Sequence, residues 1–309
     1  MNRPVTPATP SSPTDNPMLG IGAAVVAYFL LSVMNVFAKL LGPYHHPLEV
    51  GFYRNIIALI PMLVWALTVG AGQLKPNRPG GIATRAVIGT VSLVTTFAAF
   101  MALPMADATA FLFTSSLFLP LLSLIFLNEK TGPWRLAAIG VGFVGVLIML
   151  QPTGNTNSTG VMLAMCAALM HATLGTLLRY LGRADSPGVV TFYFLLIGTV
   201  VTALPMPFIA SPFHPELWWL YLGLGLSGVL AQYMLSTAFR YAQAGLVTVF
   251  NYSGLIWATL FGWLIWQDLP TTTIITGGSI VILCNVFIIW REQRAARRKR
   301  LYPRTLEGQ

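Results

Sequence analysis

Apolar residues along this chain fall in long runs that are separated by short polar connections. Ten such runs occupy residues 20–41, 51–70, 84–103, 107–127, 134–150, 160–181, 189–208, 218–241, 245–266 and 272–290. Most of them contain roughly 20 residues, the length that a helix needs to cross a hydrocarbon core about 30 Å thick. The pattern therefore predicts an all-α integral membrane protein with ten transmembrane helices.

The same sequence pattern occurs in both halves of the chain. Residues 39–42 read KLLG and residues 179–182 read RYLG, and each is followed by Pro, Val, Phe and Tyr at the same spacing, with 140 positions between equivalent residues. The acidic residues of two later connections, Glu129 and Asp268, are 139 positions apart. Chance does not align this many positions in one register, so we infer an internal duplication.

The duplication divides the chain into two five-helix repeats, predicted at residues 18–150 and 156–290. Five is an odd number, so the second repeat must enter the membrane in the opposite sense to the first. Inverted repeats of this kind are typical of secondary transporters, which bind their substrate near the bilayer midplane where the repeats meet. The fold class predicted is thus two inverted five-helix repeats.

Composition supports a membrane location. Hydrophobic residues make up 55% of the 309 residues and charged residues only 9%, which a soluble domain does not tolerate. The net charge of +9 would favour nucleic acid, but seven basic residues lie between Arg291 and Arg304, in a tail at residues 291–309 that flanks the last apolar run. Residues 1–17 are rich in Pro, Ser and Thr and are predicted to form a disordered tail without a signal peptide. The expected partners are membrane lipid and a small organic metabolite, and no nucleic acid.

The positions of Lys and Arg predict the topology. With the N-terminus in the cytoplasm, the inner connections and the C-terminal tail together hold most of the basic residues. Those in the connections are Lys75, Arg78, Arg85, Lys130, Arg135, Arg179, Arg183 and Arg240. The outer connections hold almost no Lys or Arg; they include His45, His46, Glu49, Asp107, His214, Glu216 and Asp268. We therefore expect a multi-pass protein of the inner (plasma) membrane with both termini in the cytoplasm.

These features resemble the EamA-type ten-helix branch of the drug/metabolite transporter superfamily over residues 18–290. The resemblance rests on an Ala-rich turn and a closing acidic residue in each repeat, and on two polar-aromatic blocks: MADA at 105–108 with Glu129, YAQA at 241–244 with Asp268, FYRN at 52–55, and FNYS at 250–253. It implies a transporter, similar to riboflavin and S-adenosylmethionine permeases and to exporters of amino acids and opine-type metallophores.

Polar residues at mid-depth are the candidate substrate site, because each is costly in lipid unless it faces a partner or a cavity. They are Thr95, Thr96, Ser115, Ser116, His171, Gln232, Tyr233, Asn251 and Tyr252. The alternative for the Ser and Thr hydroxyls is a hydrogen bond back to their own helix. The side chains of Asn251, Gln232 and His171 need partners beyond one turn, which favours a central cavity.

Two basic residues are candidates for the mouth of the transport path. Lys39 either extends its ammonium to the membrane interface or lines a vestibule. Arg54 has Phe194 as its repeat equivalent, so symmetry does not demand a cation there. It is therefore a candidate ligand for a carboxylate or phosphate of the substrate, or else an ion-pair partner of Glu49.

Other motifs indicate no further chemistry. Two GxGxxG stretches, at 140–145 and 223–228, lie inside apolar runs, where small residues favour close helix packing over dinucleotide binding. Cys166 and Cys284 lie in apolar runs, where buried thiols are expected, although a disulfide remains an alternative. We expect no metal, no cofactor and no ATP drive, because Cys/His metal sets and Walker-type loops are absent from the sequence. No Asp or Glu lies at mid-depth, so His171 is the one mid-depth side chain of a type whose ordinary pKa is near neutral, and it is the candidate for a proton relay.

The sequence therefore predicts a secondary transporter that exports an amino-acid-like or carboxylated metabolite by alternating access, as a monomer or a homodimer. The alternative is an uptake permease for a metabolite such as riboflavin or S-adenosylmethionine. A lipid-modifying membrane enzyme would need clustered His and acidic residues, whereas His45, His46, His171 and His214 are scattered. An ion channel would need repeated pore motifs or charged rings, which the sequence does not contain.

Overall fold

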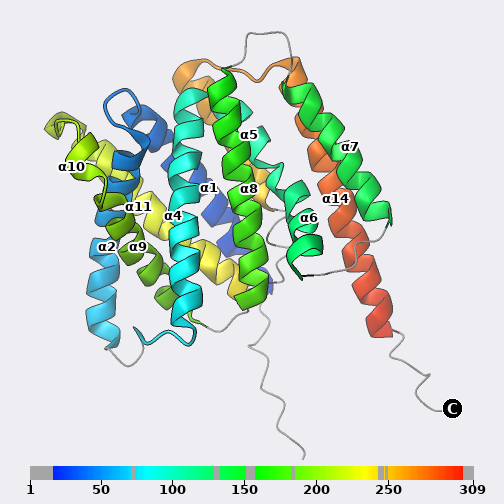
Figure 1. The fold of residues 1–309 in the computed structure, drawn as a ribbon, viewed down its shortest axis with the longest axis horizontal. Coiled ribbons are helices and arrows are strands. Elements are labelled where there is room, and N and C mark those ends of the chain that lie inside the picture. The colour runs from blue at the N-terminus through cyan, green and yellow to red at the C-terminus, as the bar shows by residue number, and fades with distance from the viewer. Residues whose placement is uncertain are drawn as a thin grey trace, which may run out of the picture.

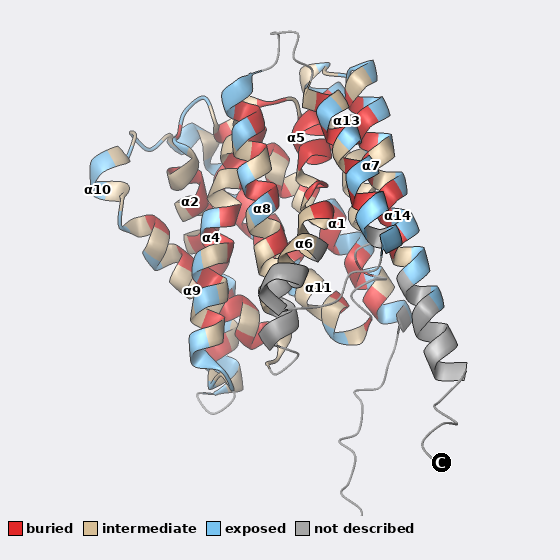
Figure 2. Cartoon of the chain, turned by 45° about the vertical axis from the view of Figure 1, so that its right-hand side comes forward, coloured by how far each residue is buried: buried red, intermediate tan, exposed pale blue. Residues whose placement is uncertain are grey.

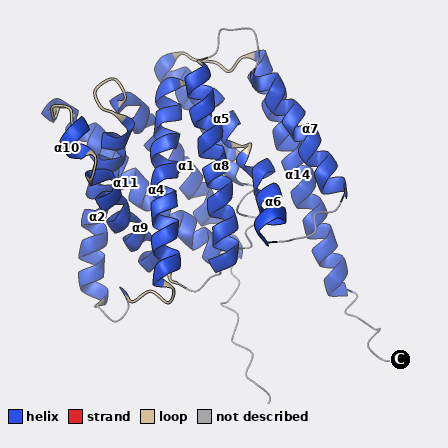
Figure 3. Cartoon of the chain, in the orientation of Figure 1, coloured by secondary structure: helices blue, strands red, loops and turns tan. Residues whose placement is uncertain are grey.

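The structure, a computed structural model, describes residues 17–70, 74–127, 133–150, 157–181, 185–242, 247 and 250–301. Every regular element within these residues is a helix (Figure 3). The described helices of the first half are α1 (Pro17–Leu41), α2 (Pro47–Val69), α4 (Pro79–Ala102), α5 (Met105–Leu112), α6 (Ser115–Leu127) and α7 (Pro133–Leu150). Those of the second half are α8 (Ser158–Leu181), α9 (Pro187–Ala203), α10 (Met206–Ile209), η1 (Pro215–Leu217), α11 (Trp218–Tyr241), α13 (Ser253–Phe261), η2 (Gly262–Trp266) and α14 (Thr272–Leu301).

Several helices begin where the sequence supplies a proline or a capping side chain. Proline is the first residue of α2, α4, α7 and α9, where its missing N–H would have no intrahelical acceptor. The side chain of His46 accepts a hydrogen bond from the Leu48 N–H at the start of α2, at 3.3 Å. Ser186 Oγ caps α9 by accepting from the Val189 N–H, at 3.4 Å.

Apolar helices dominate the described part of the chain and confirm the all-α membrane class. Five are long and apolar enough to cross a bilayer, at Met18–Leu41, Pro47–Val69, Pro79–Ala102, Pro215–Tyr241 and Thr272–Arg291. Five shorter apolar helices lie at Met105–Leu119, Leu136–Leu150, Ser158–Leu174, Pro187–Ala203 and Ser253–Trp266. Figure 2 shows exposed positions along the outward faces of the helices. Large apolar residues are among the exposed ones, for example Leu67, which is 85% exposed, and Leu147, which is 64% exposed. A surface of this kind suits lipid rather than water.

The helices pack in pairs. α1 lies against α11, α4 against α8, α2 against α9, α7 against α14, and α5 against α13. Figure 1 shows α7 and α14 side by side at one edge of the molecule and α4 beside α8 near its middle. The first turn of α1 and the last turn of α14 both lie on the lower side of this view. We call the opposite side the upper face; residues 42–46, 103–104, 210–217 and 267–271 connect the helices there.

Glycines in the two GxGxxG stretches allow close packing, as expected. A Cβ added at Gly145 of α7 would lie 2.7 Å from the carbonyl oxygen of Gly277 in α14. A Cβ at Gly225 would clash with the side chain of Ile57 of α2. Close packing is therefore confirmed at these positions, whereas Gly140 has open space around it.

Some expectations are corrected. The run at 107–127 is not one helix, because α5 ends at Leu112 and α6 begins at Ser115. Glu49 does not lie in a loop; it is in the first turn of α2 and is fully buried. Both cysteines are free, and Cys166 is exposed rather than buried. The connection containing Glu129 and Lys130 lies outside the described residues.

Candidate functional site

Both repeats contain a helix break at the same place. Between α5 and α6 the chain makes a turn at Phe113 and Thr114, and before α13 it makes a turn at Tyr252. Thr114 Oγ1 donates to the Phe111 carbonyl at 2.7 Å, and Ser253 Oγ donates to the Phe250 carbonyl, also at 2.7 Å. Thr114 and Ser253 are 139 positions apart, the spacing that also relates Glu129 to Asp268.

The two breaks meet inside the molecule. The rings of Phe113 and Tyr252 pack edge to face, with centroids 5.2 Å apart. The Tyr252 hydroxyl lies near the side chain of Ser116, at the start of α6. Tyr28 of α1 lies near enough to interact electrostatically with Tyr252. The hydroxyl groups of Tyr28, Ser116 and Tyr252, which are far apart in the sequence, therefore lie close to the contact between the two breaks.

The breaks are local turns rather than unwound segments. Phe113 and Tyr252 keep right-handed helical dihedral angles. The Thr114 N–H donates to the Phe111 carbonyl at 3.0 Å, and the Leu255 N–H donates to the Tyr252 carbonyl at 3.2 Å, as in a 3₁₀ turn. Short 3₁₀ stretches inside a helix often mark a functional hinge. The hydroxyl groups beside the turns can donate or accept hydrogen bonds with the polar groups of a small substrate.

Of the predicted hydroxyl residues, Thr95 and Thr96 lie within an unbroken helix, whereas Ser115 and Ser116 lie at a helix break. Thr95 Oγ1 donates to the Val91 carbonyl of its own helix at 2.8 Å, and Thr96 does the same with Ser92 at 2.8 Å. Thr95 is also 4.0 Å from the Met170 sulfur on α8. Ser115 and Ser116 lie at the break itself, and Ser116 Oγ donates to the Phe113 carbonyl at 2.5 Å. The bond back to the preceding turn therefore accounts for Thr95 and Thr96 but only partly for Ser116.

The remaining predicted residues lie on several helices. His171 is half-buried on α8, which packs against α4 and α6. Gln232 is half-buried on α11, whereas its neighbour Tyr233 is 39% exposed. Asn251 is half-buried and directly precedes the second break. The structure thus brings Ser116 near Tyr252, which directly follows Asn251, while His171, Gln232 and Tyr233 lie on flanking helices.

Arg54 is buried without a carboxylate partner. Its side chain is only 1% exposed, and its guanidinium donates to Asn55 Oδ1 at 2.8 Å and to the Gly228 carbonyl of α11 at 3.1 Å. It also lies over the ring of Phe194, 5.3 Å from the centroid. Among the described residues no carboxylate forms an ion pair with it. The alternative that Arg54 pairs with Glu49 is therefore wrong.

Lys39 turns into the protein at the upper face. Its ammonium donates to the Leu103 carbonyl at 2.5 Å and lies 5.0 Å from the ring centroid of Trp266. The charges of Asp107 and Asp268 also act on it. Of the two roles considered for Lys39, these contacts favour the lining of a vestibule over extension toward the membrane interface.

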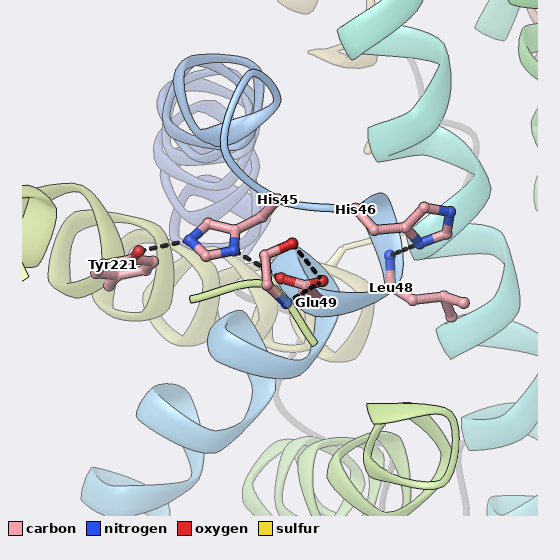
Figure 4. A network of polar contacts seen from close by, with 6 residues as sticks. His45, His46, Leu48, Glu49 and Tyr221 are labelled. Carbon is pink, nitrogen blue, oxygen red and sulfur yellow. Dashed lines mark hydrogen bonds and ion pairs between the residues drawn. The ribbon is translucent and has the colours of Figure 1, made fainter. Parts of the chain in front are cut away.

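Sequence reasoning missed a polar network at the upper face (Figure 4). Glu49 Oε2 lies 2.6 Å from His45 Nδ1, and His45 Nε2 lies 2.6 Å from the Tyr221 hydroxyl of α11. Ser211 donates to Glu49 Oε1 through its backbone N–H at 3.0 Å and through its hydroxyl at 3.1 Å. The spacing of His45 and Glu49, four residues apart around a helix start, was the only local signal for this network.

The structure also contains two apolar hollows on its lipid-facing side. One is lined by Leu255, Ile256, Thr259, Leu260, Trp263 and Leu269, and the other by Trp134, Ala137, Ala138, Val141, Leu283, Cys284 and Phe287. Neither contains a predicted site residue. Within the described residues, no group of three or more His, Cys, Asp or Glu side chains could hold a metal ion.

Comparison with known proteins identifies the family. The model of the EamA-like transporter family matches this chain twice, at residues 18–151 and 158–290. The chain belongs to the EamA-like transporter family. Family membership makes it a membrane transporter rather than an enzyme, and it agrees with the resemblance seen in the sequence.

Several curated relatives are transporters of small metabolites. The chain is 28% identical over 270 residues to a pseudopaline exporter of Pseudomonas aeruginosa, covering 86% of this chain and 94% of the relative. It is 29% identical over 254 residues to a riboflavin transporter of Vibrio cholerae, covering 81% and 85%. It is 27% identical over 284 residues to an S-adenosylmethionine uptake transporter of Rickettsia conorii, covering 91% and 96%. A solved crystal structure shares the fold, with a TM-score of 0.63 at 17% identity over 90% of this chain and 97% of the other.

Proposed function

We propose that this EamA-like transporter exports a small carboxylated or amino-acid-like metabolite by alternating access, around a site at the paired helix breaks. The observation that carries the proposal is the matched geometry of Thr114 and Ser253 at equivalent positions of the two repeats. The relatives include an exporter of pseudopaline as well as two proteins named for riboflavin and S-adenosylmethionine, so small polar metabolites are the common class. Uptake of such a metabolite is the alternative.

The arrangement proposed is ten spans in two inverted repeats, at 18–150 and 156–290, with tails at 1–17 and 291–309. Helix pairing supports it. If the third predicted span, α4, is equivalent to the eighth, α11, and the first, α1, to the sixth, α8, then inversion exchanges the α4–α8 pair with the α11–α1 pair. The α2–α9, α7–α14 and α5–α13 pairs each map onto themselves. Such a pattern is what two inverted copies around a pseudo-twofold axis produce.

Substrate is proposed to meet Ser115, Ser116, Asn251 and Tyr252 at the breaks, with Thr95, His171, Gln232 and Tyr233 lining the path on the flanking helices. Arg54 and Lys39 are proposed to supply positive charge toward the upper face. A carboxylated substrate fits this charge, because a guanidinium and an ammonium both bind carboxylates well.

Cysteine accessibility tests the site. Single cysteines at His171, Gln232, Asn251 and Tyr252 should react with small water-soluble thiol reagents, and the transported compound should slow the reaction. Phe208→Cys, at a position 89% exposed on the outside of the molecule, is the control that substrate should not protect. Uniform inertness of the four positions would place them in packed helices and contradict the cavity.

Direction and substrate are tested by flux in reconstituted vesicles. An opine-type metallophore, an amino acid, riboflavin and S-adenosylmethionine are each loaded inside or supplied outside. Expected is transport of a carboxylated compound that fails in Tyr252→Ala and persists in Phe208→Ala. Transport of riboflavin or S-adenosylmethionine alone would support the uptake alternative instead.

A further inference from the structure

One of the two apolar hollows lies between α7 and α14, which run side by side at one edge of the molecule (Figure 1). We call it the α7–α14 hollow. Four residues of α7, from Trp134 to Val141, and three of α14, from Leu283 to Phe287, line it. Ala137 is one of the small side chains among them, and it is exposed. An exposed apolar hollow in a membrane protein faces the lipid chains, so an acyl chain can lie in it.

One side of α14 changes from apolar to cationic at the lower end of this hollow. Leu283, Phe287, Arg291 and Arg294 are spaced four, four and three residues apart, so they share one side of the helix. All four are exposed. Arg291 is also the last residue of the apolar span that begins at Thr272, so its side chain lies at the edge of the membrane.

Each of the two guanidinium groups lies over a tryptophan ring. Arg291 is 5.1 Å from the ring centroid of Trp134, which itself lines the hollow, and Arg294 is 5.2 Å from that of Trp290. A stacked guanidinium carries its N–H donors in its own plane, so the ring does not occupy them. Among the described side chains, neither guanidinium forms an ion pair with a carboxylate. These donors can therefore bind an anion beside the hollow.

The surroundings of the two arginines suit a lipid headgroup. Residues 291–304 contain seven basic residues and one acidic residue, Glu292. Basic segments directly beyond a transmembrane helix attract anionic lipids. Trp134 and Trp290 are 60% and 52% exposed, and tryptophan is enriched where a membrane protein meets the lipid headgroups.

We propose that the α7–α14 hollow, with Arg291 and Arg294 at its lower rim, binds one anionic phospholipid. An acyl chain lies in the hollow, and the lipid phosphate accepts hydrogen bonds from the two guanidinium groups. A zwitterionic lipid binds less tightly, because its ammonium group brings a further positive charge toward Arg291 and Arg294. The site is separate from the helix breaks, so the inference does not depend on the proposed transport function.

A second copy of this chain fits the same surface less well. A twofold dimer through the hollow would place the same patch of both copies together. Arg291, Arg294 and the basic tail of one copy would then lie near those of the other. Like charges that meet at an interface are unfavourable, so charge favours the lipid.

The other hollow, lined by residues of α13 and η2 and by Leu269, provides a comparison within the molecule. Within the described residues, no Lys or Arg lies over a ring that lines it. We therefore expect lipid chains to occupy that hollow without preference for the headgroup.

The test counts bound lipids by native mass spectrometry of the purified full-length protein in detergent. Dioleoyl phosphatidylglycerol and dioleoyl phosphatidylcholine have the same chains and differ in headgroup charge. The parent protein should bind one phosphatidylglycerol more tightly than phosphatidylcholine. Arg291→Gln should weaken phosphatidylglycerol binding by about fivefold, the factor expected for one basic residue near anionic lipid. Ala137→Trp, which fills the hollow and leaves the charge unchanged, should remove the tight site.

Arg240→Gln is the matched control. Arg240 is also exposed and lies over an aromatic ring, 5.9 Å from the centroid of Tyr241, in the last turn of α11. It lines neither hollow, so Arg240→Gln should bind phosphatidylglycerol as the parent does. Equal losses in Arg291→Gln and Arg240→Gln would show attraction by net charge alone and would overturn the site.

Two other results also contradict the proposal. Equal affinity of the parent for the two lipids would mean that any acyl chain fills the hollow. A dimer that Ala137→Trp converts to a monomer would assign the hollow to a second copy. Thermal unfolding in detergent checks that the variants fold; if Ala137→Trp does not, the comparison of Arg291→Gln with Arg240→Gln decides.

Discussion

The ring of Tyr252 meets the ring of Phe113 edge to face, with their planes inclined at 75° and their centroids 5.2 Å apart. The two residues are 139 positions apart and stand at the break of their own helix in each repeat. Edge-to-face aromatic pairs are favourable but shallow, about 0.5–1.5 kcal/mol beyond their buried area. The contact therefore holds the two breaks side by side in this structure, and it is weak enough for them to separate during a conformational change.

Removal of the Tyr252 hydroxyl should separate packing from substrate binding. Tyr252→Phe keeps the ring contact with Phe113 and loses the hydroxyl that is proposed to bind the substrate. One hydrogen bond contributes about 0.5–1.5 kcal/mol, so apparent affinity for the substrate should fall by up to about tenfold. Thermal unfolding in detergent should change little. Vesicle transport over a range of substrate concentrations measures the affinity.

Phe113→Ala is the contrasting variant, because Phe113 is 3% exposed within the core. Its loss should destabilise the protein by about 3–5 kcal/mol. If Tyr252→Phe transports with unchanged apparent affinity, the hydroxyl has no role at the site, and the breaks would be structural features only.

Helix contact between α7 and α14 should depend on a single glycine. Gly145→Ala would bring a methyl group to 2.7 Å from the Gly277 carbonyl oxygen, which is backbone and cannot move aside. Forced overpacking of this kind costs about 1–3 kcal/mol. The unfolding temperature in detergent should therefore fall by several degrees.

Gly140→Ala on the same helix is the matched control, since nothing lies within 4 Å of the added carbon. It should be neutral, or stabilising by up to about 1 kcal/mol through helix propensity. Equal effects of the two substitutions would contradict close packing of α7 on α14.

Much of the fold could be predicted because lipid imposes a simple rule on the chain. Every backbone group in the membrane must be satisfied, so apolar runs become helices, and the observed α11 ends at the predicted residue, Tyr241. The helix breaks could not be read in the same way. Thr114 and Ser253 are small, and their hydrogen bonds to a preceding carbonyl are as common in straight helices as at a break.

The sequence indicated which residues of the candidate site are unusual, but it did not indicate which residues they contact. Arg54 was recognised as unusual, but its contacts with Gly228 and Phe194 come from helices more than a hundred residues away. Glu49 was assigned to a connection, since a charged residue at the end of an apolar run is normally solvated. Burial through Ser211 and Tyr221 depends on tertiary packing, which local sequence does not encode.

Topology is tested with a reporter that is active only outside the cytoplasm. Fused after Arg304, it should be silent, because the Lys and Arg bias predicts a C-terminus in the cytoplasm. Arg291 over the ring of Trp134, at 5.1 Å, is consistent with a cationic and aromatic belt at that interface. A fusion after Pro212, on the upper face, should be active. The reverse pattern would contradict the predicted placement of both termini in the cytoplasm.

Replacement of Arg54 should reveal whether its charge serves transport or folding. The cation is 1% exposed and has no ionic partner among the described residues, so the native state bears its desolvation cost. Arg54→Met keeps the length of the side chain and removes that charge. We expect unfolding at an equal or higher temperature, together with at least a tenfold loss of transport of a carboxylated substrate.

Arg240→Met is the control, because Arg240 is exposed at the last turn of α11 and should tolerate the change in both measurements. Arg54→Lys adds a second comparison, since an ammonium keeps the charge but cannot donate to Asn55 and Gly228 with a planar fork. If only the positive charge matters, the Arg54→Lys protein transports well. If the planar guanidinium orients the substrate, the apparent affinity of the Arg54→Lys protein for the substrate falls. A stable Arg54→Met protein with full transport would remove Arg54 from the substrate path, because a buried cation kept for function cannot be replaced by a thioether without loss.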